Sequence, residues 1–121
     1  MLEGYAKGLF EAACKEFDRT VPQKHPSQTP VTIGRCPEHF VDRLLQRVLS
    51  IKNLPFVEEI LVASIRYIEN KYDFFSSLKE NQEYGIVYKN YNIKYQCKIY
   101  SNESGIYRVE VTPVTIFKQK I

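Results

Sequence analysis

The lysines, arginines and tyrosines of the last third of the chain are the residues best suited to chemistry. Residues 82–121 hold six of the nine tyrosines, together with six Lys or Arg and three Glu. Residues 1–81 are neutral, with 11 Lys or Arg and 11 Asp or Glu. The formal net charge of +3 therefore comes entirely from residues 82–121. Cations interleaved with aromatic side chains favour contact with phosphates, nucleic-acid bases or an acidic surface.

Polar and apolar residues alternate in this region as they do in a strand that buries one face. Apolar side chains occupy the odd positions from 93 to 99, and residues 107–111 repeat the pattern after the turn sequence SNESG at 101–105. A five-residue hairpin loop there would place Lys98 opposite Arg108. Like charges that face each other are destabilising, so such a pair on an exposed face favours the binding of an anion.

We expect this exposed sheet face to bind a protein or nucleic-acid partner. A tyrosine next to the cations can stack on a base, and the second predicted helix would add basic surface if its outward side borders the sheet. The residues of this predicted binding surface are Lys94, Lys98, Tyr100, Arg108, Arg43 and Arg47. The alternative is a solvated face, because lysine and arginine are common on exposed strands, where they oppose edge-to-edge aggregation.

A different hypothesis is general acid–base catalysis of RNA cleavage without a metal ion. The reaction needs a base for the 2′-hydroxyl, a cation for the phosphate and an acid for the leaving oxygen. The candidates for these roles, with a histidine as the base, are His25, His39, Lys98, Tyr107 and Arg108. Several small ribonucleases of the toxin type also place helices before an antiparallel sheet, which is an analogy of fold and not of site.

Four potential metal ligands lie in the first 39 residues, namely Cys14, His25, Cys36 and His39. Cys36 and His39 have the spacing of half a zinc site, but the second half of a standard signature is missing. Cys14 falls on the apolar face of a predicted helix, where free cysteine usually packs as a small hydrophobic residue. The sequence also lacks a glycine-rich nucleotide-binding motif. We therefore predict neither a metal site nor a cofactor.

Periodicity predicts three helices before the alternating region. Residues 2–19 carry apolar side chains at helical spacing. Pro37 suits the first turn of a second helix, which has a two-wide apolar stripe. Asn53 is the expected N-cap of a third helix that runs to about residue 71. Residues 73–79 either continue this helix or form a separate turn.

After residue 81 the period changes from 3.6 to 2, which predicts an antiparallel meander over residues 82–121. Pro113 interrupts the pattern, so an edge, a bulge or a bend is expected there, with a last strand at residues 114–117. The length suits one domain. We predict a single α+β domain over residues 1–121, with three N-terminal helices (within residues 1–81) packed on one face of a four- to five-stranded antiparallel C-terminal sheet.

The pentapeptide TPVTI occurs twice, at residues 29–33 and 112–116. The sequences around the two copies do not match, which argues against an internal repeat. Each copy predicts a short strand entered through a proline. The sequence leaves open whether Val31–Ile33 joins the C-terminal sheet, and such pairing would draw the loop with His25 towards the basic face.

We expect a soluble cytoplasmic protein that does not contact a membrane. The N-terminus lacks the features of a signal peptide, and no apolar run approaches the roughly 20 residues that span a bilayer. Three cysteines are an odd, sparse set, which favours a reducing compartment over a disulfide framework. The leading hypothesis is a small intracellular, non-enzymatic interaction module, and the alternative is the metal-independent ribonuclease. The sequence does not predict the oligomeric state.

Overall fold

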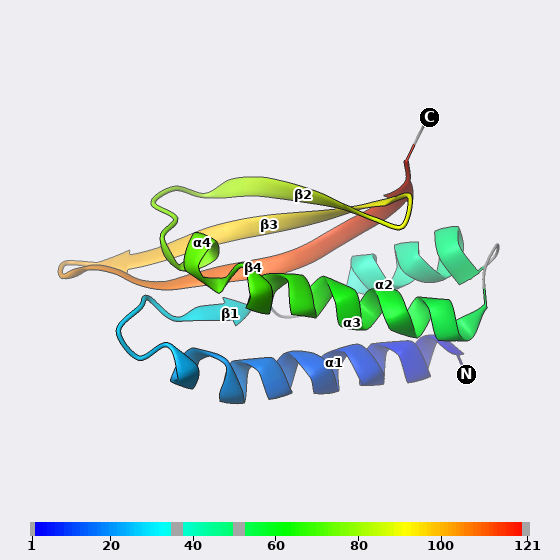
Figure 1. Ribbon diagram of the computed structural model, residues 1–121, viewed down its shortest axis with the longest axis horizontal. Coiled ribbons are helices and arrows are strands. Elements are labelled where there is room, and N and C mark those ends of the chain that lie inside the picture. The colour runs from blue at the N-terminus through cyan, green and yellow to red at the C-terminus, as the bar shows by residue number, and fades with distance from the viewer. Residues whose placement is uncertain (1, 35–37, 50–52, 120–121) are drawn as a thin grey trace.

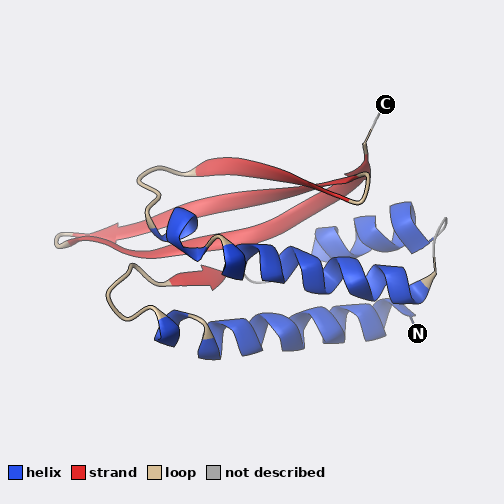
Figure 2. Ribbon diagram, in the orientation of Figure 1, coloured by secondary structure: helices blue, strands red, loops and turns tan. Residues whose placement is uncertain are grey.

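The computed structural model describes residues 2–34, 38–49 and 53–119, in which helices lie on one side of a four-stranded sheet (Figures 1 and 2). The helical segments are α1 (Leu2–Thr20), the single turn η1 (Pro22–Lys24), α2 (Glu38–Leu44), its π-helical continuation η2 (Leu45–Leu49), α3 (Leu54–Asn70) and α4 (Tyr72–Ser76). The strands are β1 (Val31–Ile33), β2 (Gln82–Tyr88), β3 (Tyr91–Asn102) and β4 (Gly105–Lys118). The α+β class is confirmed.

The sheet is mixed, so the prediction of a purely antiparallel sheet is wrong. Its strand order is β1-β4-β3-β2, in which β2, β3 and β4 form the antiparallel meander and β1 pairs in parallel with β4. Val31 lies beside Val109, and the amide of Gly34 donates to the carbonyl oxygen of Val111 at 3.1 Å. Val31–Ile33 therefore does join the C-terminal sheet. Side-chain alternation marks a strand but does not encode its direction, which the long connection through the helices decides.

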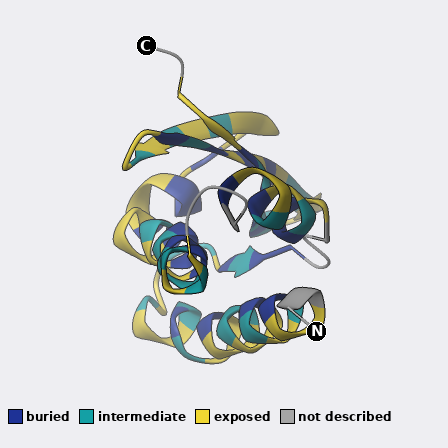
Figure 3. Cartoon of the chain, turned by 90° about the vertical axis from the view of Figure 1, so that its right-hand side faces the viewer, coloured by how far each residue is buried: buried dark blue, intermediate teal, exposed yellow. Residues whose placement is uncertain are grey.

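The helical layer also differs from the three predicted helices. The N-cap of α3 is confirmed, because Asn53 Oδ1 accepts a hydrogen bond from the amide of Phe56 at 3.1 Å. α3 ends at Asn70, and α4 follows separately because Lys71, with φ −108° and ψ 28°, leaves the helical conformation. α2 contacts β4, whereas α1 packs against α3, α2 and the edge strand β1. The helices thus form two tiers beneath the sheet, with α1 farthest from it, as the end-on view in Figure 3 shows.

β4 passes through Pro113 without a break, so the prediction of a separate last strand at residues 114–117 is wrong. The register between β3 and β4 shifts at this point, where Tyr95 lies opposite Pro113 and Lys94 lies opposite Thr115. The extra residue, Val114, forms a β-bulge. A bulge tolerates a proline that cannot donate to the ladder, so the strand bends instead of ending.

Side chains from the helices accept hydrogen bonds from the outward amides of the edge strand β1. The amide of Val31 donates to the hydroxyl of Tyr72 at 2.9 Å, and the amide of Ile33 donates to Asp18 Oδ1 at 2.9 Å. Farther along the same side of the sheet, beyond the end of β1, Arg47 Nη1 donates to the carbonyl oxygen of Ile116 at 2.8 Å. This edge is therefore blocked against pairing with another strand.

The core lies between the inner face of the sheet and the two tiers of helices. Its largest buried side chains include Tyr72, Tyr95, Phe10, Phe40 and Phe75. The hydroxyl of Tyr95 donates to the carbonyl oxygen of Ser64 in α3 at 2.7 Å, so this aromatic residue is buried without an unsatisfied polar group. In the described segments, none of the helices combines the length and the apolarity that crossing a bilayer requires.

Replacing Tyr72 with Phe should lower the free energy of unfolding by about 1–3 kcal/mol, because the amide of Val31 would lose its buried acceptor. Urea denaturation followed by circular dichroism measures this change. The matched control is Tyr107→Phe, which removes a hydroxyl from a side chain that is 49% exposed and should change stability by less than about 0.5 kcal/mol. Equal stability of the two variants would contradict the role given to Tyr72.

Candidate functional site

The helices cover one face of the sheet and leave the other face open to solvent. We call this open side the outer face. It carries the residues that alternate with the buried ones on three strands: Thr32, Lys94, Gln96, Lys98, Tyr100, Arg108, Glu110, Thr112 and Thr115. Four of the six residues predicted to bind a partner therefore share one surface, namely Lys94, Lys98, Tyr100 and Arg108.

The register of the β3–β4 hairpin differs from the one predicted. β3 continues to Asn102, which pairs with Gly105, so only two residues form the turn and Gly105 takes the positive φ of 117°. A second register shift, after Tyr100, leaves Tyr107 as the extra residue. Lys98 consequently lies opposite Glu110 and not opposite Arg108. The predicted pair of facing cations is wrong, because opposite charges face each other.

Arg108 is held in a network of polar and aromatic contacts. Its guanidinium lies 4.2 Å from the centre of the Tyr100 ring, a cation–π contact. Arg108 Nη1 also donates to Thr32 Oγ1 at 3.2 Å and to Glu110 Oε2 at 3.4 Å. The Tyr100 hydroxyl lies 3.5 Å from Glu110 Oε1. Glu110 was not among the predicted site residues, although its alternation with Arg108 already placed both on the same face.

Lys94 and Lys98 supply the charge on the outer face that no carboxylate binds. Both side chains are exposed, and neither forms a salt bridge with any described residue. A shallow pocket of about 200 Å³ lies next to Lys98, and its lining includes Asn81, Gln96 and the acidic Glu83 of β2. The outer face therefore offers two solvated ammonium groups on β3, with Lys98 next to the Arg108–Tyr100 pair and Lys94 four residues farther along the strand.

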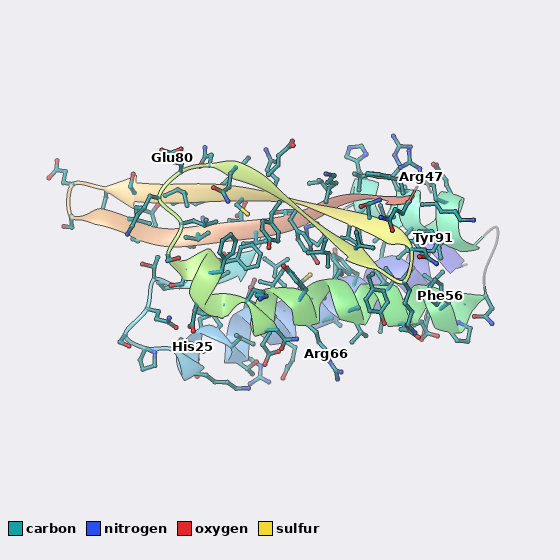
Figure 4. All side chains as sticks on the ribbon, turned by 45° about the horizontal axis from the view of Figure 1, so that its top comes forward. His25, Arg47, Phe56, Arg66, Glu80 and Tyr91 are labelled. Carbon is teal, nitrogen blue, oxygen red and sulfur yellow. The ribbon has the colours of Figure 1, made fainter. Side chains whose placement is uncertain are left out.

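The two arginines of the second helical segment lie at the far end of the sheet. Arg47 donates to Ile116 at the edge of β4, so the helix does border the sheet there (Figure 4). Arg43 is exposed, and its guanidinium donates to Gln46 Oε1 at 3.2 Å. Arg47 is thus bound to β4, whereas Arg43 is an exposed cation on α2.

The structure does not bring the histidines to the outer face. His25 stacks on Tyr72 with ring centres 4.2 Å apart, and Figure 4 shows it beside the end of α1 on the helical side. His39 is exposed on α2. Neither histidine hydrogen-bonds to Lys98, Tyr107 or Arg108 among the described residues. β1 joins the sheet, as the ribonuclease hypothesis required. The loop that carries His25 and leads into β1, however, stays against the helices.

The two cysteines that the structure describes, Cys14 and Cys97, are half-buried and buried and pack as apolar residues. Cys14 is half-buried on α1, and burial raises the pKa of its thiol to about 12. Cys97 lies in the core, where burial raises its thiol pKa to about 11. Cys36 lies outside the described residues. Within the described part of the chain, no three His, Cys, Asp or Glu side chains come together as ligands for a metal ion.

Comparisons with protein-family models, with curated proteins and with solved structures find no match to this chain. Its function must therefore be inferred from the fold and from the outer face.

Asp18 links the edge of the sheet to the charges around Arg108. Partial burial raises the pKa of its carboxyl, opposed by the hydrogen bond from Ile33 and by the positive charge of Arg108, while Glu110 adds to the increase. Asp18 therefore binds a proton more readily in the folded state than in the unfolded state, where the pKa is about 3.9.

The free energy of unfolding of the wild type, relative to that of Asp18→Asn, should increase as the pH falls through this raised pKa. The asparagine keeps an acceptor for the amide of Ile33 but cannot take up the proton. Urea denaturation of both proteins between neutral pH and about pH 4 measures the difference. A difference that stays constant or falls over this range would show that the folded protein does not raise the pKa of Asp18.

Proposed function

We propose that the protein is a small, non-enzymatic interaction module whose outer face binds single-stranded RNA. The observation that carries the proposal is the row of outer-face groups along β3, in which the solvated Lys98 adjoins the stacked Arg108 and Tyr100 and the solvated Lys94 lies four residues farther along the strand. Solvated ammonium groups bind phosphates with release of counterions, and tyrosine rings stack on bases without regard to sequence. Tyr107, 49% exposed with its ring centre 6.5 Å from that of Tyr100, extends the aromatic surface.

RNA suits this surface better than a protein partner does. The centre of a stable protein interface is apolar and poor in charged residues. The centre of the outer face instead carries Gln96, Lys98, Glu110 and Thr112. A nucleic-acid interface is polar and wet, which matches these residues.

Changing Lys94 and Lys98 together to Glu should weaken the binding of a single-stranded RNA oligonucleotide by about tenfold or more near 0.1 M salt. The slope of log K against log salt concentration should shrink by about 0.7 for each phosphate that the variant no longer neutralises. Fluorescence anisotropy over a salt series measures both quantities. The melting temperature should stay nearly constant, because both side chains are exposed.

The matched control changes Lys15 and Lys24 to Glu, which alters the net charge equally on exposed positions of α1 and η1. Its affinity for RNA should stay within about threefold of the wild type, because distant exposed charges are largely screened. Equal loss of affinity in both double variants would mean that net charge alone drives binding. Unchanged binding in the Lys94/Lys98 variant would remove the proposal.

A second candidate is cleavage of the bound RNA. It is favoured by Glu110, whose carboxylate lies near the guanidinium of Arg108, near the Tyr100 hydroxyl and opposite Lys98. A carboxylate base, a cation and a hydroxyl acid are the groups that attack by a 2′-hydroxyl needs. Histidine has no part in this version of the reaction.

End-labelled RNA incubated with the protein in the presence of EDTA separates the two candidates. Under the binding proposal the RNA stays intact. Fragments that end in a cyclic phosphate, formed about a hundredfold or more slowly by Glu110→Gln, would support cleavage. Fragments formed equally by this variant would point to a contaminating nuclease.

A further inference from the structure

The two edges of the sheet differ in how far other parts of the chain cover their backbone groups. On the β1 side, Tyr72 and Asp18 accept from the outward amides of β1, and Arg47 donates to the carbonyl oxygen of Ile116 in β4. On the other side, β2 is a seven-residue strand with neither proline nor lysine, and no strand of the described chain lies beyond it. Proline, inward charge and lysine are the usual means of protecting an edge strand. β2 thus retains a surface that can accept another strand.

The backbone groups that β2 presents to solvent follow from its hairpin with β3. Lys89 and Asn90 form a two-residue turn with positive φ angles of 46° and 70°, and Tyr88 pairs with Tyr91. In such a hairpin the residues that flank the turn hydrogen-bond to each other, and the bonding then alternates along the strand. Tyr88, Ile86, Tyr84 and Gln82 therefore face β3. The N–H and C=O groups of Glu83, Gly85 and Val87 lie on the open edge.

A groove of about 590 Å³ runs along this edge, between β2 and α3. Its lining includes Glu58, Val62, Arg66, Ile86, Val87 and Tyr88. Val87 is 55% exposed and Val62 is 41% exposed, so the edge presents apolar side chains as well as backbone groups. Apolar surface beside an open strand is typical of a surface that binds an extended chain.

α3 and β2 run side by side in opposite directions, and two hydrogen bonds set their relative position. The Tyr88 hydroxyl donates to Glu59 Oε2 at 2.6 Å, and the Tyr67 hydroxyl donates to the Tyr84 hydroxyl at 2.9 Å. The midpoints of these two pairs place Ile86 level with Ala63, in the middle of α3.

We infer that a second copy of this chain binds here, with the two β2 strands paired antiparallel about Ile86 in a symmetric dimer. In this arrangement Tyr84 lies opposite the second copy's Tyr88, while Lys89 keeps its salt bridge to Glu59 of its own chain at 2.6 Å. Aromatic pairs stabilise neighbouring strands. A two-fold axis makes every such contact twice, and the two sheets become one of eight strands.

The charges on α3 are placed nearly symmetrically about the same axis. Glu58 and Arg66 lie four residues on either side of Val62, the neighbour of Ala63, so Glu58 of one copy lies near Arg66 of the other. Glu58 Oε2 also accepts a hydrogen bond from the Tyr5 hydroxyl of its own chain at 2.7 Å. Figure 4 shows the Arg66 side chain extending from α3 into solvent, and Arg66 forms no salt bridge with a described residue. The open strand and the charges on α3 therefore both fit a second copy of the chain.

A charge exchange across the axis tests the dimer. Arg66→Glu alone and Glu58→Arg alone each place like charges opposite each other, and each should raise the dimer dissociation constant about tenfold, equivalent to about 1.4 kcal/mol. The double variant carries both changes and restores opposite charges, so its dissociation constant should return to within about threefold of the wild type. Sedimentation velocity over a wide range of protein concentration measures these constants.

Two further variants separate dimerisation from folding and from net charge. Glu69→Lys, at an exposed position of α3 outside the groove lining, changes the charge without touching the axis and should leave the dimer intact. Val87→Lys adds a charged side chain to the open edge and should weaken the dimer while the circular dichroism spectrum stays unchanged. Amide hydrogen exchange should show protection of Gly85 and Val87 that increases with protein concentration.

A wild-type protein that stays monomeric at every concentration would overturn the inference. So would a dimer that the charge changes and Val87→Lys leave unaffected. Protection of the Gly85 and Val87 amides by an unrelated extended peptide, in a protein that remains monomeric, would assign the edge to a different chain and would also overturn it.

Discussion

Two hydrogen bonds from the outward amides of β1, one to the Tyr72 hydroxyl and one to the Asp18 carboxylate, are the constraint on which the layered arrangement depends. A strand of three residues has few backbone bonds of its own and is marginal without other support. Because Tyr72 belongs to α4 and Asp18 to α1, the same two bonds attach both helical tiers to the sheet. These two hydrogen bonds therefore block the β1 edge, fix the position of the strand and orient the helices against the sheet.

The candidate site also depends on this edge. Parallel pairing places Thr32 of β1 beside Glu110, where it accepts a hydrogen bond from Arg108. Without β1, the guanidinium would lose its hydrogen bond to Thr32 and would keep its contacts with Tyr100 and Glu110. The orientation of the central cation on the outer face is therefore set by a strand that lies 76 residues earlier in the chain.

Local patterns in the sequence predicted local structure well. Alternation located the strands of the meander, and Asn53 marked the start of α3 because a side-chain cap is a short-range interaction. The hairpin register could not be predicted, since the two-residue turn and the extra residue at Tyr107 each move the partner of Lys98 by one position, from Arg108 to Glu110 in total.

Contacts between segments that lie far apart in the sequence could not be predicted either. The direction of β1 depends on where the helices carry the chain, and the stacking of His25 on Tyr72 depends on two segments that meet only after folding. The parallel pair also has a consequence for the order of folding. Val31 must find Val109, which the ribosome adds 78 residues later, so the pairing has a high contact order and cannot form before Val109 has been made. Until then the helices remain with their apolar sides uncovered, a stage at which a nascent chain is most dependent on chaperones.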